Sequence, residues 1–137
     1  MSSRPMSPRG TLPHHTDDAL LVKHYVLQTL VLDVLERDIA RLAASSLKMA
    51  YIYIESLRQA QDEATAELYR IRKQFRQRGI KVYDEERQTH GIRVHYMCRG
   101  YEHSFYMLRG LLRTEVTGLM KRYLHIHSST QPDTIAP

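Results

Sequence analysis

Apolar residues at helical spacing dominate the first third of the chain. From Leu20 to Leu42 they cover more than one face of a helix, which is typical of a helix packed on several sides. Thr16 is a favourable N-cap, and Asp17 and Asp18 suit the first turn, where free backbone N–H groups and the helix dipole favour negative charge. The pattern therefore predicts a central helix that begins near residue 17.

A second helix, predicted over residues 47–78, has the clearest periodicity of the chain. Its seam positions are spaced alternately four and three residues apart, as in a coiled coil. They are Ala50, Ile54, Leu57, Gln61, Ala64, Leu68, Ile71 and Phe75. Gly79 stands where a left-handed C-terminal cap would lie, and 32 residues would make a rod of roughly 50 Å. Such a rod needs a partner along its length.

Two partners satisfy that need, and the sequence leaves the choice open. The first helix can fold back antiparallel, or a second copy of the chain can pack against the seam. The residues between the helices, Ala43-Ala-Ser-Ser46, contain neither Gly nor Pro. A second helix capped by a serine and one continuous kinked helix both fit them.

After Gly79 the apolar period changes to two. Apolar residues on either side of a polar Gln-Thr-His-Gly turn predict a β-hairpin near residues 80–98. The register that pairs favourable neighbours places four pairs opposite each other: Arg87 and Ile92, Glu86 and Arg93, Asp84 and His95, and Tyr83 and Tyr96.

A final helix is predicted to begin near Glu102. Its apolar residues recur at steps of three and four, namely Phe105, Leu108, Leu112, Val116, Leu119, Tyr123 and Ile126. The fold class is therefore mainly α (α+β): a long antiparallel helical hairpin, a β-hairpin and a C-terminal helix in one domain, residues 17–127. Residues 1–16 and 128–137 are expected to be disordered tails, because they cannot bury apolar surface.

Composition adds a cellular setting to this fold. The 137 residues suit one domain, and Cys98 is the only cysteine, so no internal disulfide can form and a reducing compartment is expected. The first sixteen residues contain no apolar stretch typical of a signal peptide. The most apolar segment, residues 20–35, is interrupted by Lys23 and Asp33, so it predicts a buried helix and no membrane span. We expect a cytoplasmic protein.

Charge is distributed unevenly along the chain. Residues 17–68 hold five Lys or Arg against nine Asp or Glu, a net −4, whereas residues 69–127 hold thirteen against five, a net +8. The basic side peaks at Arg70, Arg72, Lys73, Arg76 and Arg78, a candidate site for nucleic-acid phosphates. The alternative, which we favour, is that these cations complement the C-terminal dipole of the helix and the acidic half of the same fold.

The sequence contains little that indicates catalysis. It has no Gly-rich phosphate loop, no Gly-x-Ser-x-Gly elbow, no Cys-x-x-Cys and no Glu-x-x-His step, so we expect no catalytic residue, cofactor or metal. His90, His95, Cys98 and His103 lie close together, but their spacing does not suit zinc, and His95 and Cys98 fall on opposite faces of a strand.

The segment from Cys98 to His103 is interpreted as a structural joint around Gly100. The alternative is a polar site at this joint, made by Arg99, Tyr101, Glu102 and His103 beside the basic end of the second helix.

Four short motifs occur in an order that resembles a known family. They are Val34-Leu-Glu-Arg-Asp38, Gly79-Ile-Lys-Val-Tyr83, Arg99-Gly-Tyr-Glu102 and Lys121-Arg-Tyr-Leu124. The family consists of small uncharacterised cytosolic proteins of endospore-forming Gram-positive bacteria, and the resemblance covers about residues 27–125. It implies a bacterial cytosolic setting and a link to sporulation, and it supplies no catalytic residue. The chain departs from the family at Ser45-Ser-Leu-Lys48, where the family has a proline.

These observations favour a non-enzymatic interaction or scaffold protein that forms a homo-oligomer or binds a protein partner. The candidate interaction seam is Ile54, Leu57, Leu68, Ile71 and Phe75, and further apolar surface is expected at Met49, Tyr51, Ile52 and Tyr53. The alternative is a nucleic-acid-binding module that uses the basic end of the second helix. A third hypothesis is a metal or small-molecule sensor built on His95, Cys98 and His103. No membrane association and no small-molecule substrate are predicted.

Overall fold

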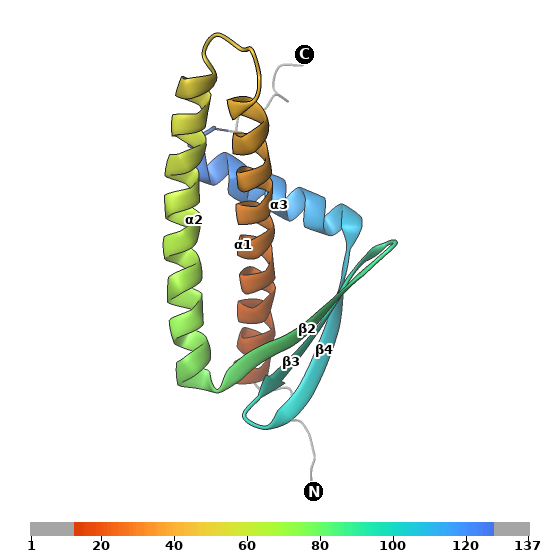
Figure 1. The fold of residues 1–137 in the computed structure, drawn as a ribbon. Helices are drawn as coiled ribbons and strands as arrows, with labels where there is room; N and C mark the ends of the chain where they lie inside the picture. Colours follow the sequence, from red (N-terminus) through yellow and green to blue (C-terminus); the bar gives the residue numbers. More distant parts are fainter. Residues whose placement is uncertain (1–12, 128–137) are drawn as a thin grey trace, which may run out of the picture.

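The computed structural model describes residues 13–127 as three helices and a three-stranded sheet (Figure 1). In chain order the elements are α1 (Pro13–Ala43), α2 (Ala50–Arg78), β2 (Ile80–Gln88), β3 (Gly91–Cys98), β4 (Tyr101–Leu108) and α3 (Arg109–Tyr123). The predicted α+β class with an excess of helix is confirmed. Of the tails predicted to be disordered, 1–16 and 128–137, the structure describes only residues 13–16, and there the prediction is wrong because they belong to α1; the rest lies outside the described residues.

The two long helices form an antiparallel hairpin, so the partner of the second helix is the first helix of the same chain. The buried residues of α2 are Ala60, Ala64, Leu68, Ile71 and Phe75. Of the predicted seam, Leu68, Ile71 and Phe75 are therefore confirmed as buried. Ile54 and Leu57 are only partly buried. The seam thus faces α1 along its whole length but is fully covered only over its second half.

The boundaries of the two long helices differ from the predicted ones at both N-terminal ends. The first helix begins at Pro13, not near residue 17, so Thr16 is not its N-cap and Asp18 lies beyond its first turn. The second helix begins at Ala50, and Ser45 does not cap it. The Ser45 hydroxyl instead donates to the Leu42 carbonyl at 2.7 Å, within the loop between the helices. At the other end Gly79 is the left-handed cap, with φ 68°, as predicted.

The sheet is antiparallel, in the order β2-β3-β4. Three of the four predicted pairs are confirmed, namely Arg87 with Ile92, Glu86 with Arg93 and Asp84 with His95. The fourth is wrong, because a bulge between Val82 and Asp84 places Val82 opposite Tyr96. The bulge has a physical reason. Ile80, an even-numbered residue of β2, faces the core, whereas the β2 residues opposite Val94 and Ile92 are odd-numbered. Because side chains alternate between the two faces of a strand, one extra residue is needed to keep both parts of β2 in register with the inner face of β3.

The prediction of a helix from Glu102 is wrong for its first two turns. Residues Tyr101–Leu108 form β4, and α3 begins only at Arg109. The turn before β4 consists of Arg99 with φ 50° and Gly100 with φ 89°, two positive values as in a type I′ turn that joins antiparallel strands. Because β3 provides a strand edge at this point, pairing with it outweighs the helical spacing of Phe105 and Leu108.

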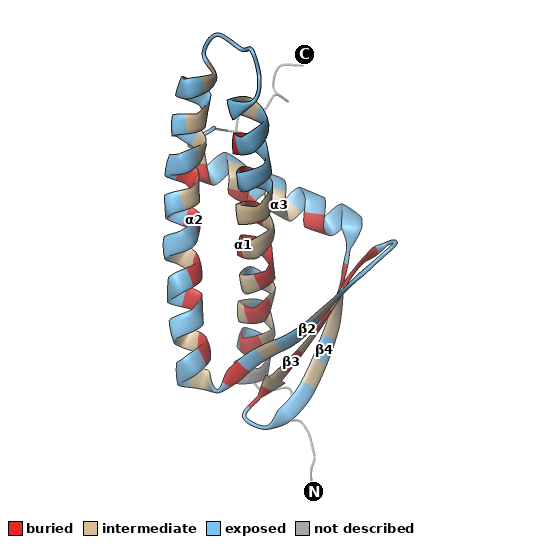
Figure 2. Cartoon of the chain, viewed as in Figure 1, coloured by how far each residue is buried: buried red, intermediate tan, exposed pale blue. Residues whose placement is uncertain are grey.

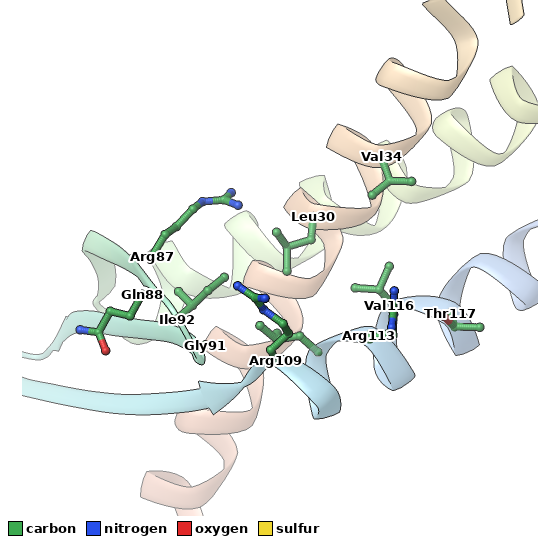
Figure 3. Close-up of a pocket in the computed structure, with 11 residues that line it drawn as sticks. Leu30, Val34, Arg87, Gln88, Gly91, Ile92, Arg109, Arg113, Val116 and Thr117 are labelled. Atoms are coloured by element: carbon green, nitrogen blue, oxygen red, sulfur yellow. The ribbon is translucent and has the colours of Figure 1, made fainter. Parts of the chain in front are cut away.

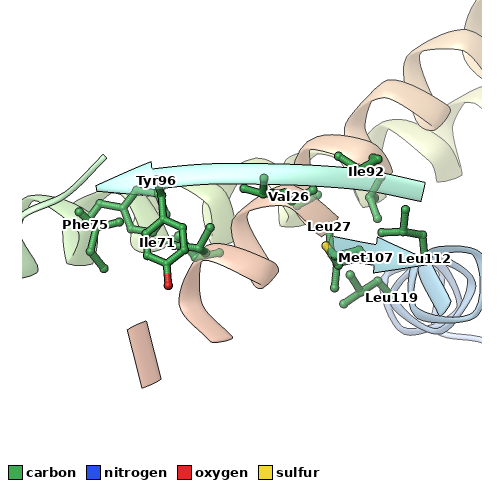
Figure 4. Packing of buried hydrophobic residues seen from close by; sticks show 14 of the residues in the cluster. Val26, Leu27, Ile71, Phe75, Ile92, Tyr96, Met107, Leu112 and Leu119 are labelled. Atoms are coloured by element: carbon green, nitrogen blue, oxygen red, sulfur yellow. The ribbon is translucent and has the colours of Figure 1, made fainter. Parts of the chain in front are cut away.

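The core lies where α1 crosses the sheet and α3. Five apolar residues of α1 are at most 1% exposed, namely Val22, Val26, Leu27, Val31 and Leu35. The inner face of β3 adds Ile92, Val94, Tyr96 and Cys98, and α3 adds Leu112 and Leu119 (Figures 2 and 4). Within residues 13–127 no helix has the length and apolarity needed to cross a membrane.

Candidate functional site

A cavity of about 390 Å³ lies between the middle of α1, the turn end of β2 and β3, and the start of α3 (Figure 3). Its floor is apolar and its rim carries three arginines. The apolar residues are Leu30, Val34, Ile92, Leu112 and Val116; the arginines are Arg87, Arg109 and Arg113; Gln88, Gly91 and Thr117 complete the lining. The lining contains no Asp or Glu. This site was not predicted, because its residues come from four elements and no local motif joins them.

An ionic cluster around a buried carboxylate, here called the Asp18 clasp, ties α1 to the ends of α2 and β3. Asp18, whose side chain is 3% exposed, accepts a hydrogen bond from Arg78 Nη1 at 3.1 Å. Its other oxygen accepts from Arg99 Nη2 at 2.9 Å and from the Cys98 thiol at 3.1 Å. Arg99 Nη1 also donates to the Arg78 carbonyl at 2.9 Å. The clasp thereby fixes three chain segments to one carboxylate.

The clasp shifts the pKa values of its members in opposite directions. Burial acts to raise the pKa of Asp18, but the hydrogen bonds from Cys98, Arg99 and Arg78 outweigh burial and hold that pKa below its ordinary value. Burial, followed by the hydrogen bond to Asp18 and its charge, raises the pKa of Cys98 to about 11. The thiol therefore stays protonated at neutral pH and acts as a donor, which does not suit a nucleophile.

The predicted polar site at the joint is assembled only in part. Arg99 is the one member of that set that enters the clasp. Tyr101 is 74% exposed, and Glu102 is exposed as well. His103 stacks on Tyr96 with ring centroids 5.2 Å apart. Gly100, with φ 89°, serves the turn, as the structural interpretation predicted.

The residues of the sensor hypothesis are not brought together. Tyr96 and Cys98 share the inner face of β3, and His103 stacks on Tyr96, whereas His95 points to the outer face, where its ring lies 6.0 Å from that of Tyr83. A different group, Asp84, Glu86 and His95, has ligand atoms within 4.8 Å of one another. Both carboxylates are exposed, and His95 Nε2 lies 3.3 Å from Glu86 Oε2. This contact between an imidazole and a carboxylate lies on the outer face of the sheet, and exposed acidic groups of this kind are common without a bound metal.

The basic end of α2 is divided among several interactions. Arg70 pairs with Glu67 at 2.7 Å, Arg72 lies 5.9 Å above the Tyr25 ring, and Arg78 belongs to the Asp18 clasp. Lys73 and Arg76 are exposed, and neither forms an ion pair with any residue of the described range 13–127. The five cations therefore do not form a single free patch.

The hairpin tip, residues 47–54, is the most apolar exposed surface of the described chain. Its exposed side chains are Leu47, Met49, Tyr51, Ile52 and Tyr53, with exposed fractions between 43% and 66%. The tip lies beyond the sheet and α3, as the pale blue end of the helical hairpin in Figure 2 shows. A shallow hollow of about 340 Å³ adjoins it, lined in part by Leu42, Leu47 and Leu57. Here the predicted apolar surface is confirmed.

Comparison with known proteins identifies relatives but no fold neighbour. A family model described as "YhjD protein" matches residues 13–128. The "Uncharacterized protein YhjD" of Bacillus subtilis (strain 168) is 24% identical over 104 residues, which cover 76% of this chain and 87% of that protein. No solved structure matches the chain. The resemblance to a family of Gram-positive bacteria is thereby confirmed.

Proposed function

We propose that this chain, which belongs to the YhjD protein family, is a non-enzymatic interaction protein that self-associates through its hairpin tip. The observation that carries the proposal is a run of five consecutive apolar residues, Ala50–Ile54, at the exposed start of α2. Its three central residues, Tyr51, Ile52 and Tyr53, are exposed, and exposed runs of consecutive apolar residues are unusual unless a partner covers them.

The geometry of the run explains why one partner helix is not enough. Successive helical residues are rotated by about 100°, so Tyr51, Ile52 and Tyr53 point in three different directions. The partly buried Ile54 continues the seam that faces α1, whereas these three side chains are all exposed. A helix that is apolar on all sides is stable when it is covered on all sides. In residues 13–127 the fully buried residues end at Ile39 on α1 and begin at Ala60 on α2, so the core of the chain does not reach the tip.

A second copy of the chain is the occupant that best fits this tip. The tip offers both projecting side chains, such as Ile52, and the adjoining hollow beside Leu42 and Leu57. A two-fold axis would seat each projection in the hollow of the other copy, as isologous interfaces require. Glu55 and Arg58 lie on the next turn, are exposed and have no ion pair within the described chain, so they can pair across the same axis.

Sedimentation velocity across the micromolar range tests the proposal. The parent should show a dimer that dissociates on dilution, and Tyr51→Glu with Ile52→Glu should be monomeric at every concentration. Tyr69→Glu is a matched control, because Tyr69 lies on the same helix and is 65% exposed against 66% for Tyr51. A parent that is monomeric throughout, or a control that dissociates as the tip variant does, contradicts self-association through the tip. Repeating the measurement on residues 13–127 shows whether the flanking residues take part.

The proposed setting is the bacterial cytoplasm, with a role linked to sporulation. The support for this setting is the resemblance of the four motifs described above to the bacterial family, and it is independent of the geometry of the hairpin tip. A deletion strain of the native host tests it: spore yield should fall, and a copy that carries the tip variant should fail to restore it. Unchanged spore yield would remove the link to sporulation and leave the self-association proposal intact.

Nucleic-acid binding is the second candidate function. The exposed Lys73 and Arg76 support it, and the internal partners of Arg70, Arg72 and Arg78 count against it. We therefore rank it below self-association.

A further inference from the structure

We propose that the cavity between α1, the end of the sheet and α3 binds a small anionic amphiphile: an oxyanion head, carboxylate or phosphate monoester, joined to a short alkyl chain. This inference is independent of the hairpin tip. It rests on three features of the cavity, namely its apolar floor, its arginine rim and the absence of any acidic residue from its lining.

The floor provides a surface for an apolar group. Ile92 and Leu112 are 5% and 8% exposed and close its base. Leu30 and Val34 extend it along α1, and Val34 is 37% exposed, an unusual value for a valine in the middle of the most buried helix. The volume of about 390 Å³ lies within the range of ligand pockets, toward its small end. The cavity therefore suits a short chain and not a full membrane lipid.

The rim provides positive charge without a counter-charge. Arg87 comes from β2, and Arg109 and Arg113 come from α3, so two sides of the cavity are basic (Figure 3). None of the three forms an ion pair or a side-chain hydrogen bond with a residue in the range 13–127. Other arginines of the same chain do find partners: Arg37 with Asp33, Arg70 with Glu67, and Arg78 and Arg99 with Asp18.

Like charges gathered at one cavity repel each other, and an anion in that cavity relieves the repulsion. A guanidinium presents paired N–H donors that match the two oxygens of a carboxylate or phosphate, and such charge-assisted hydrogen bonds are stronger than neutral ones. Gln88 and Thr117, the remaining polar residues of the lining, offer neutral hydrogen bonds. The head would thus lie at the rim and the alkyl chain over Leu30 and Ile92.

Calorimetric titration with defined probes tests the inference, each below its micelle-forming concentration. Decanoate and decyl phosphate represent the two heads, decanol has the body alone, and inorganic phosphate has the head alone. Both amphiphiles should bind with one site per chain, and decanol and phosphate should each bind at least about tenfold more weakly, because each lacks one of the two contributions. The stronger of the two amphiphiles identifies the head. Amide NMR shifts should concentrate at residues 87–92 and 109–117.

Two variants and one control separate the site from general attraction to a basic protein. Arg109→Gln with Arg113→Gln should weaken decanoate binding by about tenfold or more, since two charged donors are lost. Thr117→Trp, at an exposed position, should weaken it by filling the cavity. Lys121→Gln, an exposed cation on the same helix but outside the lining, should leave it unchanged. Decanol binding as tightly as decanoate, equal losses in the control, or NMR shifts at the hairpin tip would each overturn the inference.

Discussion

The base of the helical hairpin, around Ile71 and Phe75, and its tip are both rich in apolar residues and have opposite surroundings. At the base, Ile71 and Phe75 are 2% and 7% exposed, because the sheet adds a further layer to the two helices. At the tip, Ile52 and Tyr53 are 43% and 49% exposed, because only α1 lies beside α2 there. Periodicity thus identifies the face on which a helix is apolar, whereas the layers around the helix determine how far along its length that face is covered.

The largest expected difference between base and tip is the cost of truncating an isoleucine. Ile71→Ala should lower the free energy of unfolding by about 2 to 5 kcal/mol, because it leaves a cavity in a packed core. Ile52→Ala makes the same change on the same helix at an exposed position and should cost less than about 0.5 kcal/mol. Urea unfolding at low protein concentration measures both. Equal costs would mean that base and tip do not differ in packing.

The Asp18 clasp gives the base a polar anchor for which the described part of the tip has no equivalent, and Asp18→Asn should break it. Removing the charge should cost about 3 kcal/mol at neutral pH, at the low end for a buried ion pair, because both arginines can reach solvent. Because the folded state lowers the pKa of Asp18, its stabilisation is complete above about pH 4 and declines as pH falls further.

Unfolding followed from neutral to acid pH checks this prediction. The parent and the Asp18→Asn variant should converge in stability as the pH falls below about 4. A constant difference between them down to strongly acidic pH would show that the charge of Asp18 does not stabilise the fold.

The Cys98 thiol offers a smaller effect at the opposite end of the pH scale. Its pKa is raised from 9.0 to about 11 in the folded chain, so the folded state holds the proton that the unfolded state loses. The contribution is complete below about pH 9 and is lost as pH rises through about 11, by about 2 to 3 kcal/mol in total. Cys98→Ser keeps a donor for Asp18 and removes the titration. Its stability relative to the parent should therefore rise between these two pH values, and parallel profiles would contradict the assignment.

The smallest expected effect comes from the basic end of α2, changed by Arg72→Gln, Lys73→Gln and Arg76→Gln together. Glutamine has nearly the same helix propensity, so the variant should fold. It should lose less than about 1 kcal/mol, from the contact of Arg72 with the Tyr25 ring and a modest dipole effect. We expect no nucleic-acid binding by the parent at physiological salt beyond weak general attraction.

If the basic end of α2 binds nucleic acid, the same triple variant should give a different result. Affinity would fall for all nucleic-acid sequences alike, and the slope of log affinity against log salt would shrink by up to about three units. Salt-sensitive binding by the parent that the triple variant abolishes would place nucleic-acid binding above self-association. A filter-binding assay at several salt concentrations measures both quantities.

The parts of the fold that the sequence predicts correctly are those fixed by local chemistry. Gly79 ends α2 because its φ of 68° suits glycine, and the pairing of Arg87 with Ile92 follows from the turn between the strands. The part it misses, β4, depends on the edge that β3 provides, which no short window of sequence contains. The sequence did contain one signal for β4, the dipeptide Arg99-Gly100, because a two-residue loop that ends in glycine between two apolar runs is typical of a tight hairpin turn.

The candidate sites divide in the same way, into a site that neighbouring residues predict and sites that join residues far apart in the chain. The exposed tip was predicted from a run of neighbouring residues, Met49–Tyr53, and is confirmed as exposed. The arginine-rimmed cavity joins Leu30, Arg87 and Arg113, which are far apart in the chain. The clasp was missed for the same reason, since Asp18 looked like a first-turn helix residue. Spatial neighbours without a sequence motif become visible only when the elements are assembled.

The clasp also has a consequence for the order in which the chain assembles. Asp18 is separated by 60 residues from Arg78, by 80 from Cys98 and by 81 from Arg99. During synthesis α1 therefore leaves the ribosome long before any of its charged partners exists. The apolar residues of α1 that pack against β3 likewise have no partner until β3 has been synthesised. We expect an isolated fragment that ends before Arg99 to hold helical segments without a fixed tertiary structure, and folding to become cooperative only when the turn after β3 has been made.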